Sequence, residues 1–234
     1  MIPARAALLL AAMVATGYPR PAFSQNAKRE FWPEFDVYVQ QNEIVRIVFA
    51  DSGDQDRDIN YRQGKFAYYV DFALRPVFRR ELRWRSDVFR QRYLDFRTGC
   101  EYLTSLSNNS LSHESRIVIE VTPRYRLPGA IVIDNRNRAE LRFIDGSGFS
   151  QRYRNRLQVN RDFGIRKFLF TPFVNAEVFY DTRYSSWTTE RYELGVQIPV
   201  GPHLLFEPYA VRQHDTESHP SYINAIALTV KVFF

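Results

Sequence analysis

The feature that most constrains this chain is a strict alternation of apolar and polar residues over long segments. Between residues 190 and 200 almost every second side chain is apolar, and those between are mainly charged or polar. The same pattern recurs in 65–75, 116–126 and 136–144. Successive side chains of a β-strand point to opposite faces, so a period of two predicts strands with one apolar and one polar face. The chain is therefore predicted to be all-β.

The alternating segments predict twelve strands. Many span 9–13 residues, whereas strands of soluble sheets usually have about five or six and a tilted membrane strand needs roughly 9–11. Twelve is also even, as in bacterial single-chain barrels. The predicted strands cover 31–40, 43–51, 65–75, 78–88, 92–104, 114–126, 136–144, 149–160, 166–181, 188–200, 203–213 and 220–234.

The first 24 residues have the composition of a secretory signal peptide. Arg5 provides a positive charge, residues 6–15 are apolar and helix-prone, and Ala22-Phe23-Ser24 fits a cleavage site. An apolar run of this length is too short for a helical span, which takes about 20 residues. We expect residues 1–24 to be removed after export. Residues 25–234 contain no linker-like tract and are expected to form one domain.

The charge balance is basic but shows no basic block. The net charge is +6, with 28 Arg against 4 Lys, and the arginines alternate with acidic and apolar residues. That distribution, together with the export signal, argues against nucleic acid as a partner. Arginine suits a crowded ionic network, because its planar guanidinium holds carboxylates bidentately and keeps its charge. The single Cys100 excludes an internal disulfide, and we expect it to face outward.

The two faces differ in a way that favours a membrane. The polar face often carries Arg and Glu or Asp on the same strand, while the apolar face is rich in aromatic residues and nearly free of charge. Lipid cannot accept hydrogen bonds, so a spanning sheet must close on itself and keep its charges in the lumen. We therefore expect a closed antiparallel transmembrane β-barrel in the outer membrane of a Gram-negative bacterium. A soluble periplasmic β-protein also alternates and is the alternative.

The last strand supports the membrane prediction. Its alternating apolar residues end in an aromatic, which resembles the C-terminal insertion signal of bacterial outer-membrane barrels, although Thr229 replaces the usual glycine. The resemblance implies the barrel-assembly machinery and outer-membrane lipids as partners. The residues of this predicted signal are Leu228, Val230, Val232 and Phe234.

Several short runs carry a family resemblance. They are 137–143, 151–157, 177–181, 191–196 and 207–209. In this order and spacing they resemble a bacterial family catalogued as a domain of unknown function and regarded as outer-membrane β-barrels. The resemblance extends over about 115–234. It implies a fold and a location, and no reaction.

Charged residues on the predicted inner face form the first candidate site. They could line a porin-like passage selective for an anionic solute, since rings of arginine favour anions. They could instead form a self-neutralising salt-bridge network that fills a narrow barrel, which is the interpretation we favour. The identity of any small-molecule solute stays open. The predicted set is Arg116, Glu120, Arg124, Arg138, Glu140, Arg142, Arg152, Arg154, Arg156, Glu177, Arg191 and Glu193.

A second candidate is the pair His113 and Ser115. Residues two apart on a strand share a face, so His113 could act as general base for Ser115 in an outer-leaflet lipid hydrolase. The sequence shows neither a third group to orient the imidazole nor an oxyanion element nearby. We therefore assign no catalytic residue and expect a non-catalytic role.

Cofactor and metal sites are not expected. The one histidine-rich cluster, residues 214–219, fits no standard metal spacing, and no Gly-rich phosphate loop occurs. Five aromatic residues near strand ends suit girdles at the membrane interfaces. They are Trp32, Trp84, Trp187, Tyr180 and Tyr184. Residues 52–64 do not fit the alternation of short and long connections. Either the first strands are shifted in this prediction, or the segment is an inner plug or lid.

Overall fold

The computed structural model describes residues 27–56, 61–77, 92–107, 110–165, 168–217 and 221–234. The regular structure of these residues is entirely β, as the alternation predicts, and none of them forms a helix long and apolar enough to cross a membrane. The predicted signal peptide and the predicted strand 78–88 lie outside the described residues.

Twelve strands follow one another along the chain, eleven of them between 12 and 18 residues long. Apart from the short strand Phe163–Ile165, each of them corresponds to a predicted segment, with bounds that differ by up to five residues. The strands are β1 (Lys28–Gln40), β2 (Val45–Asp56), β3 (Tyr61–Val77), β4 (Arg92–Ser107), β5 (Ser110–Leu127), β6 (Ile131–Ile144), β7 (Gly148–Arg161), β8 (Phe163–Ile165), β9 (Phe168–Asp181), β10 (Ser186–Val200), β11 (Leu204–Asp215) and β12 (Tyr222–Phe233).

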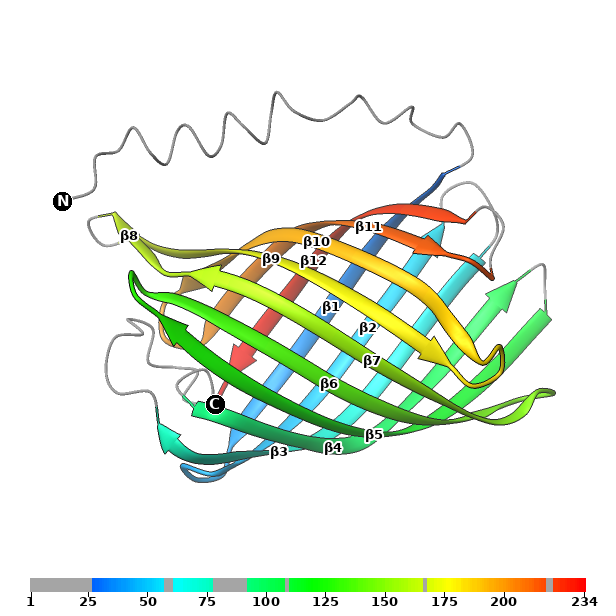
Figure 1. The fold of residues 1–234 in the computed structure, drawn as a ribbon, viewed down its shortest axis with the longest axis horizontal. Coiled ribbons are helices and arrows are strands. Elements are labelled where there is room, and N and C mark those ends of the chain that lie inside the picture. The colour runs from blue at the N-terminus through cyan, green and yellow to red at the C-terminus, as the bar shows by residue number, and fades with distance from the viewer. Residues whose placement is uncertain (1–26, 57–60, 78–91, 108–109, 166–167, 218–220) are drawn as a thin grey trace.

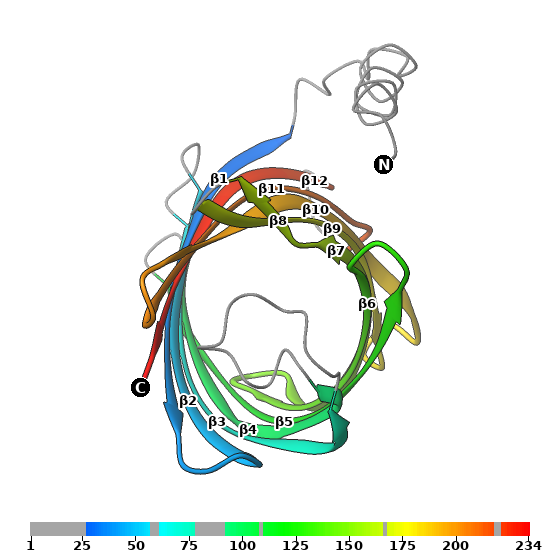
Figure 2. The ribbon, with the colours of Figure 1, turned by 90° about the vertical axis from the view of Figure 1, so that its left-hand side faces the viewer.

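The sheet closes on itself as a barrel, which Figure 2 shows as a ring. Each strand pairs with its neighbours in chain order, except that β7 pairs directly with β9 and the short β8 pairs only with β9. Eleven of the described strands therefore form the ring, so the prediction of twelve is wrong. β8 is a small extension beyond the ring.

The odd number of strands changes how the barrel closes. In a meander of antiparallel hairpins, an odd count makes the first and last strands run in the same direction. β1 accordingly pairs with β12 in parallel, from Lys28 opposite Ile223 to Tyr38 opposite Phe233. The prediction of a wholly antiparallel barrel is wrong at this seam. At its end, the amide of Gln40 donates to the carbonyl of Phe234 at 2.8 Å.

The direct pairing of β3 with β4 also accounts for residues 52–64. Most of this segment belongs to the long β2–β3 hairpin, because β2 continues to Asp56 and β3 begins at Tyr61. The ends of β2, β4, β6, β9 and β11 lie at the same rim of the barrel (Figure 1). The described part of 52–64 is thus barrel wall, and neither a plug nor a lid.

The two faces of the sheet have opposite chemistry. Leu194 and Ile226 are 66% and 69% exposed on the outside, while Glu140 is completely buried on the inside. The predicted orientation of the apolar rows is therefore correct. A soluble sandwich would show the reverse, with a dry apolar interior and charges in solvent.

Candidate functional site

The barrel encloses a cavity of about 600 Å³ to which all eleven ring strands contribute side chains. Acidic and basic residues line it in equal number. The alternating pattern places every second residue of each strand inside, so the charged residues of the strands gather in the lumen. The arrangement of the charges, and not their sum, therefore decides what the lumen can do.

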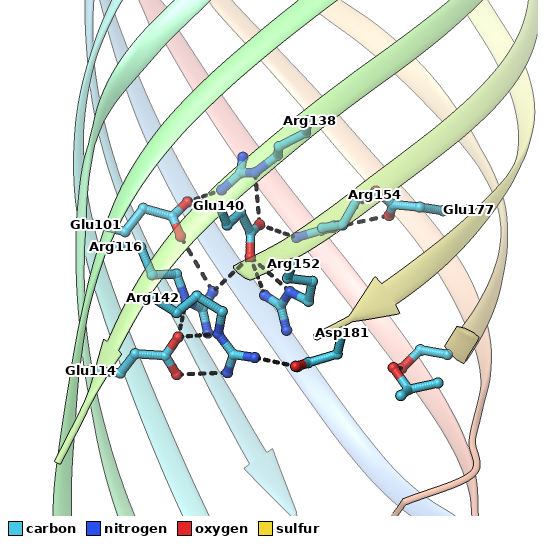
Figure 3. A network of polar contacts seen from close by, with 12 residues as sticks. Glu101, Glu114, Arg116, Arg138, Glu140, Arg142, Arg152, Arg154, Glu177 and Asp181 are labelled. Carbon is cyan, nitrogen blue, oxygen red and sulfur yellow. Dashed lines mark hydrogen bonds and ion pairs between the residues drawn. The ribbon is translucent and has the colours of Figure 1, made fainter. Parts of the chain in front are cut away.

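Glu140 is the centre of the densest set of contacts (Figure 3). Its carboxylate accepts from Arg138 Nε at 2.8 Å, lies 2.5 Å from Arg152 Nη2 and 3.2 Å from Arg154 Nη1. Arg116 Nη1 lies 4.0 Å away. A fully buried carboxylate is tolerated only when it is ion-paired and hydrogen-bonded, and here several guanidinium groups meet that need.

Other carboxylates extend these contacts around the wall. Glu177 on β9 accepts from Arg136 at 2.6 Å and from Arg154 at 3.0 Å. Glu101 on β4 pairs with Arg138 and, at 3.3 Å, with Arg116. Arg116, Arg138 and Arg154 each link two or more carboxylates. Strands β4 to β9 are therefore joined by charges as well as by their backbones.

A second branch runs toward the rim at which β9 ends. Glu114 pairs with both Arg116 and Arg142 at 2.5 Å. Arg142 reaches across to Asp181 at 2.6 Å, and Asp181 also pairs with Arg183 in the β9–β10 turn at 2.8 Å. Figure 3 shows this branch below Glu140. We call the contacts described in these three paragraphs the arginine network.

The lumen charges are distributed unevenly around the ring. We define the arginine wall as β5, β6 and β7, and the seam wall as β11, β12 and β1. Among the described residues that line the cavity or belong to the arginine network, the arginine wall carries eight arginines against four carboxylates, and the seam wall five carboxylates against two lysines. These residues are Arg116, Arg124, Arg136, Arg138, Arg142, Arg152, Arg154 and Arg156 with Glu114, Glu120, Asp134 and Glu140, and then Glu30, Glu34, Asp36, Glu207 and Asp215 with Lys28 and Lys231.

A comparison with known protein families identifies the family of this chain. The family model described as "Protein of unknown function (DUF2490)" matches residues 60–224. The chain belongs to this family. The match confirms the resemblance noted from the sequence, but it begins well before residue 115 and ends before the last residues of β12.

Two further comparisons add to the family assignment. No curated protein sequence matches this DUF2490 chain. Among solved structures, LpxR from Salmonella typhimurium is similar, with 8% identity, a TM-score of 0.50, and coverage of 81% of this chain and 83% of LpxR. At this identity the likeness concerns the fold alone.

The structure brings most of the predicted inner residues of this DUF2490 barrel into one network. Arg116, Arg138, Arg142, Arg152, Arg154, Glu140 and Glu177 all belong to the arginine network, and Glu120 lies at its edge, 3.7 Å from Arg138. The remaining four predicted residues lie in the same cavity. Arg124 pairs with Asp95 and Asp134, Arg191 donates to Gln213 at 2.8 Å, Glu193 accepts from Asn175 at 2.7 Å, and the buried Nε of Arg156 has no hydrogen-bond partner among the described residues.

Sequence reasoning missed several participants. Glu101, Glu114 and Asp181 lie at the correct alternate positions for the lumen, but they stand in strands whose pattern is weaker or at strand ends. The pattern gives no sign that Phe179 faces inward, because apolar residues flank it on both sides. It is buried beneath the guanidinium of Arg154, whose Cζ lies 4.4 Å from the ring centre.

The prediction that Trp32 belongs to an aromatic girdle on the outer surface is wrong. Its side chain faces the lumen under the guanidinium of Arg191, whose Cζ lies 4.8 Å from the ring centre. Trp32 is therefore not part of an aromatic girdle. Trp187 and Tyr184, by contrast, are 55% and 45% exposed, as a position at the outer surface requires. Trp84 lies outside the described residues.

His113 and Ser115 lie together on the outer face of β5. They line a groove of about 430 Å³ with Tyr102, Phe143 and Phe149, among other residues. His113 Nδ1 is hydrogen-bonded to the Tyr102 hydroxyl at 2.8 Å, and the two rings are stacked. Tyr102 thus holds the imidazole, a partner that the sequence did not reveal.

The other predicted positions have simpler surroundings. No group of three or more His, Cys, Asp or Glu residues suited to a metal ion occurs within the described ranges. His214 stacks on Tyr222 with ring centres 4.6 Å apart, and His219 lies outside the described residues. Cys100 is exposed on the outside. The residues of the predicted insertion signal, Leu228, Val230 and Val232, lie on the outer face of β12, and the exposed Phe234 follows them.

Proposed function

We propose that this chain is an integral outer-membrane β-barrel whose lumen is a narrow aqueous passage for small polar solutes. The observation that carries the proposal is the sidedness of the wall, with apolar side chains outside and charges inside. A membrane makes this arrangement stable, whereas water would leave the apolar belt exposed.

The outer belt has the composition that a bilayer requires. Large apolar residues on both sides of the ring, among them Ile119, Phe35 and Leu157, are between 44% and 48% exposed. The ring has no free sheet edge over its described length, because every ring strand pairs on both sides. An unpaired edge would cost several kcal/mol for each unsatisfied backbone group in lipid.

The lumen suits small solutes. Its cavity of about 600 Å³ falls in the range of small-molecule sites, which is roughly 300–1,000 Å³. The arginine network occupies one side and narrows the interior. The lumen therefore contains the salt-bridge network and still leaves a passage beside it.

Location is tested by fractionating cells that express the full chain. We expect the protein in the outer-membrane fraction, resistant to extraction by high salt and carbonate. Recovery in the soluble periplasm would overturn the membrane proposal.

Conduction is tested with the refolded protein in planar bilayers. We expect small, discrete current steps. Arg156→Gln, which alters the lumen outside the arginine network, should change the conductance, whereas Arg62→Gln at an exposed outward position should not. A folded barrel that never conducts would contradict the passage while leaving the barrel intact.

A second candidate function rests on the groove that contains His113 and Ser115. The Tyr102 hydrogen bond fixes the imidazole beside a serine at a lipid-facing surface, so phospholipid hydrolysis is the activity to test. If the groove is catalytic, Ser115→Ala should abolish hydrolysis and the exposed Ser112→Ala should retain it. Absence of hydrolysis by the folded wild-type protein would exclude this activity.

A further inference from the structure

The arginine wall holds donors that the network leaves unsatisfied. Arg136 and Arg156 lie directly opposite each other on β6 and β7, which places two positive charges side by side. Their buried Nε groups have no hydrogen-bond partner in the described part of the chain. Glu120 Oε2 lies 3.9 Å from Arg136 Nε, beyond hydrogen-bond distance, while Arg136 Nη2 pairs with Glu177 at 2.6 Å. Adjacent like charges are unfavourable, and a guanidinium pair of this kind suits a carboxylate or phosphate group.

The seam wall presents the complementary feature. Asp36 on β1 receives a hydrogen bond from the Tyr38 hydroxyl on one oxygen at 2.8 Å, and its other oxygen, Oδ1, is buried with no partner among the described residues. Glu34, two residues before it, accepts from Thr229 at 3.2 Å and lies 3.7 Å from Lys65. Both carboxylates line the same cavity as the two arginines. An ammonium group would satisfy them.

The two features face each other across the lumen. In the ring of eleven strands, β6 lies opposite β12 and β1. Arg136 and Glu34 line the same cavity. The lumen therefore carries a fixed electric field directed from the arginine wall to the seam wall, across the barrel axis.

This field distinguishes solutes by the separation of their charges. A simple anion is attracted by the arginine wall and repelled by the seam wall, and the reverse holds for a simple cation. A zwitterion whose two groups are separated can satisfy both walls at once. We infer that the lumen binds zwitterionic solutes, with the carboxylate or phosphate at Arg136 and Arg156 and the ammonium group at Glu34 and Asp36. The inference rests on the proposed water-filled lumen.

The probes are 4-aminobutyrate, butyrate and butylammonium, which are similar in size and differ in charge. Each is added to single channels carrying a KCl current. We expect 4-aminobutyrate to halve the current at a concentration at least about tenfold lower than either singly charged probe, because only it matches both walls. Equal potency of butyrate and 4-aminobutyrate would overturn the inference in favour of a plain anion site.

Substitutions at each end of the proposed site test which residues bind the two charged groups of the solute. Arg156→Gln and Asp36→Asn should each weaken the block by 4-aminobutyrate by at least about threefold, while the outward Arg62→Gln leaves it unchanged. Folding of each variant is verified by its heat-dependent shift on gels. If neither lumen variant changes the block, the assigned residues are wrong and the inference fails.

Equilibrium dialysis of labelled 4-aminobutyrate against the folded barrel in detergent separates this inference from the proposed function. Binding without any conductance would reject the passage and support the site. Conductance without preferential binding would reject the site and support the passage.

Discussion

The arginine wall and the seam wall share one sequence pattern and differ in what holds them together. In the arginine wall, Glu140 is buried among guanidinium groups that connect it to Glu101 and Glu177. In the seam wall, packing contacts between aromatic and small side chains accompany isolated polar pairs such as Glu207 with Lys231. Tyr38 of the first strand stacks on Phe233 of the last, with ring centres 4.7 Å apart and nearly parallel planes.

The difference shows that alternation fixes which way a residue points but not how the inside is stabilised. Around Ala225 and Ala227 of the seam wall, small side chains leave room for the larger Trp32 and Tyr209. The arginine wall instead fills its interior with long, charged side chains whose positions depend on one another. We therefore expect the free energy of unfolding to respond differently to equivalent changes in the two walls.

The largest expected effect is that of Glu140→Gln. Removing this buried charge leaves Arg138, Arg152 and Arg154 without their shared carboxylate, and breaking such a buried ion pair costs about 3–5 kcal/mol. The matched change in the seam wall is Glu207→Gln. Glu207 is more accessible and pairs with Lys231 at 2.8 Å, so this change should cost only about 1 kcal/mol.

Both values are measured as free energies of unfolding in urea, with the protein in lipid vesicles. Equal losses for Glu140→Gln and Glu207→Gln would break the comparison, because the two walls would then depend on their charges to the same degree.

The next effect should be equal in the two walls. Ile119 and Phe35 lie near the middle of β5 and β1 and face outward. An arginine at the bilayer midplane costs about 2–4 kcal/mol, so Ile119→Arg and Phe35→Arg should destabilise the barrel similarly in vesicles. Insertion yield and unfolding free energy are the measurements. A loss on one side only would mean that lipid does not surround the whole ring.

The smallest expected effect concerns the aromatic stack at the seam between β1 and β12. Phe233→Leu removes the stacked ring on Tyr38 while keeping an apolar side chain, and aromatic pairs contribute about 0.5–1.5 kcal/mol beyond their buried area. The neighbouring Phe234→Leu, on the exposed outer face, should stay within about 0.5 kcal/mol. Equal effects in equilibrium unfolding would show that the stack does not stabilise the closure.

Much of the fold follows from the sequence. The period of two identifies the bounds of most strands and the direction of their side chains, because the geometry of a strand imposes that period locally. Alternation alone therefore assigns Arg138, Glu140 and Arg154 to the interior. The same local rule predicts the outward position of Cys100.

The tertiary structure alone decided the properties that depend on strands distant in the sequence. The number of strands in the ring determines whether β1 meets β12 in parallel or antiparallel, and no local pattern encodes that closure. The partners of each arginine depend on register and on the curvature that brings β4 and β9 to the same network. The sequence by itself determined the face of each residue, whereas closure of the barrel decided which charges meet and which, such as Arg156 and Asp36, were left facing the lumen.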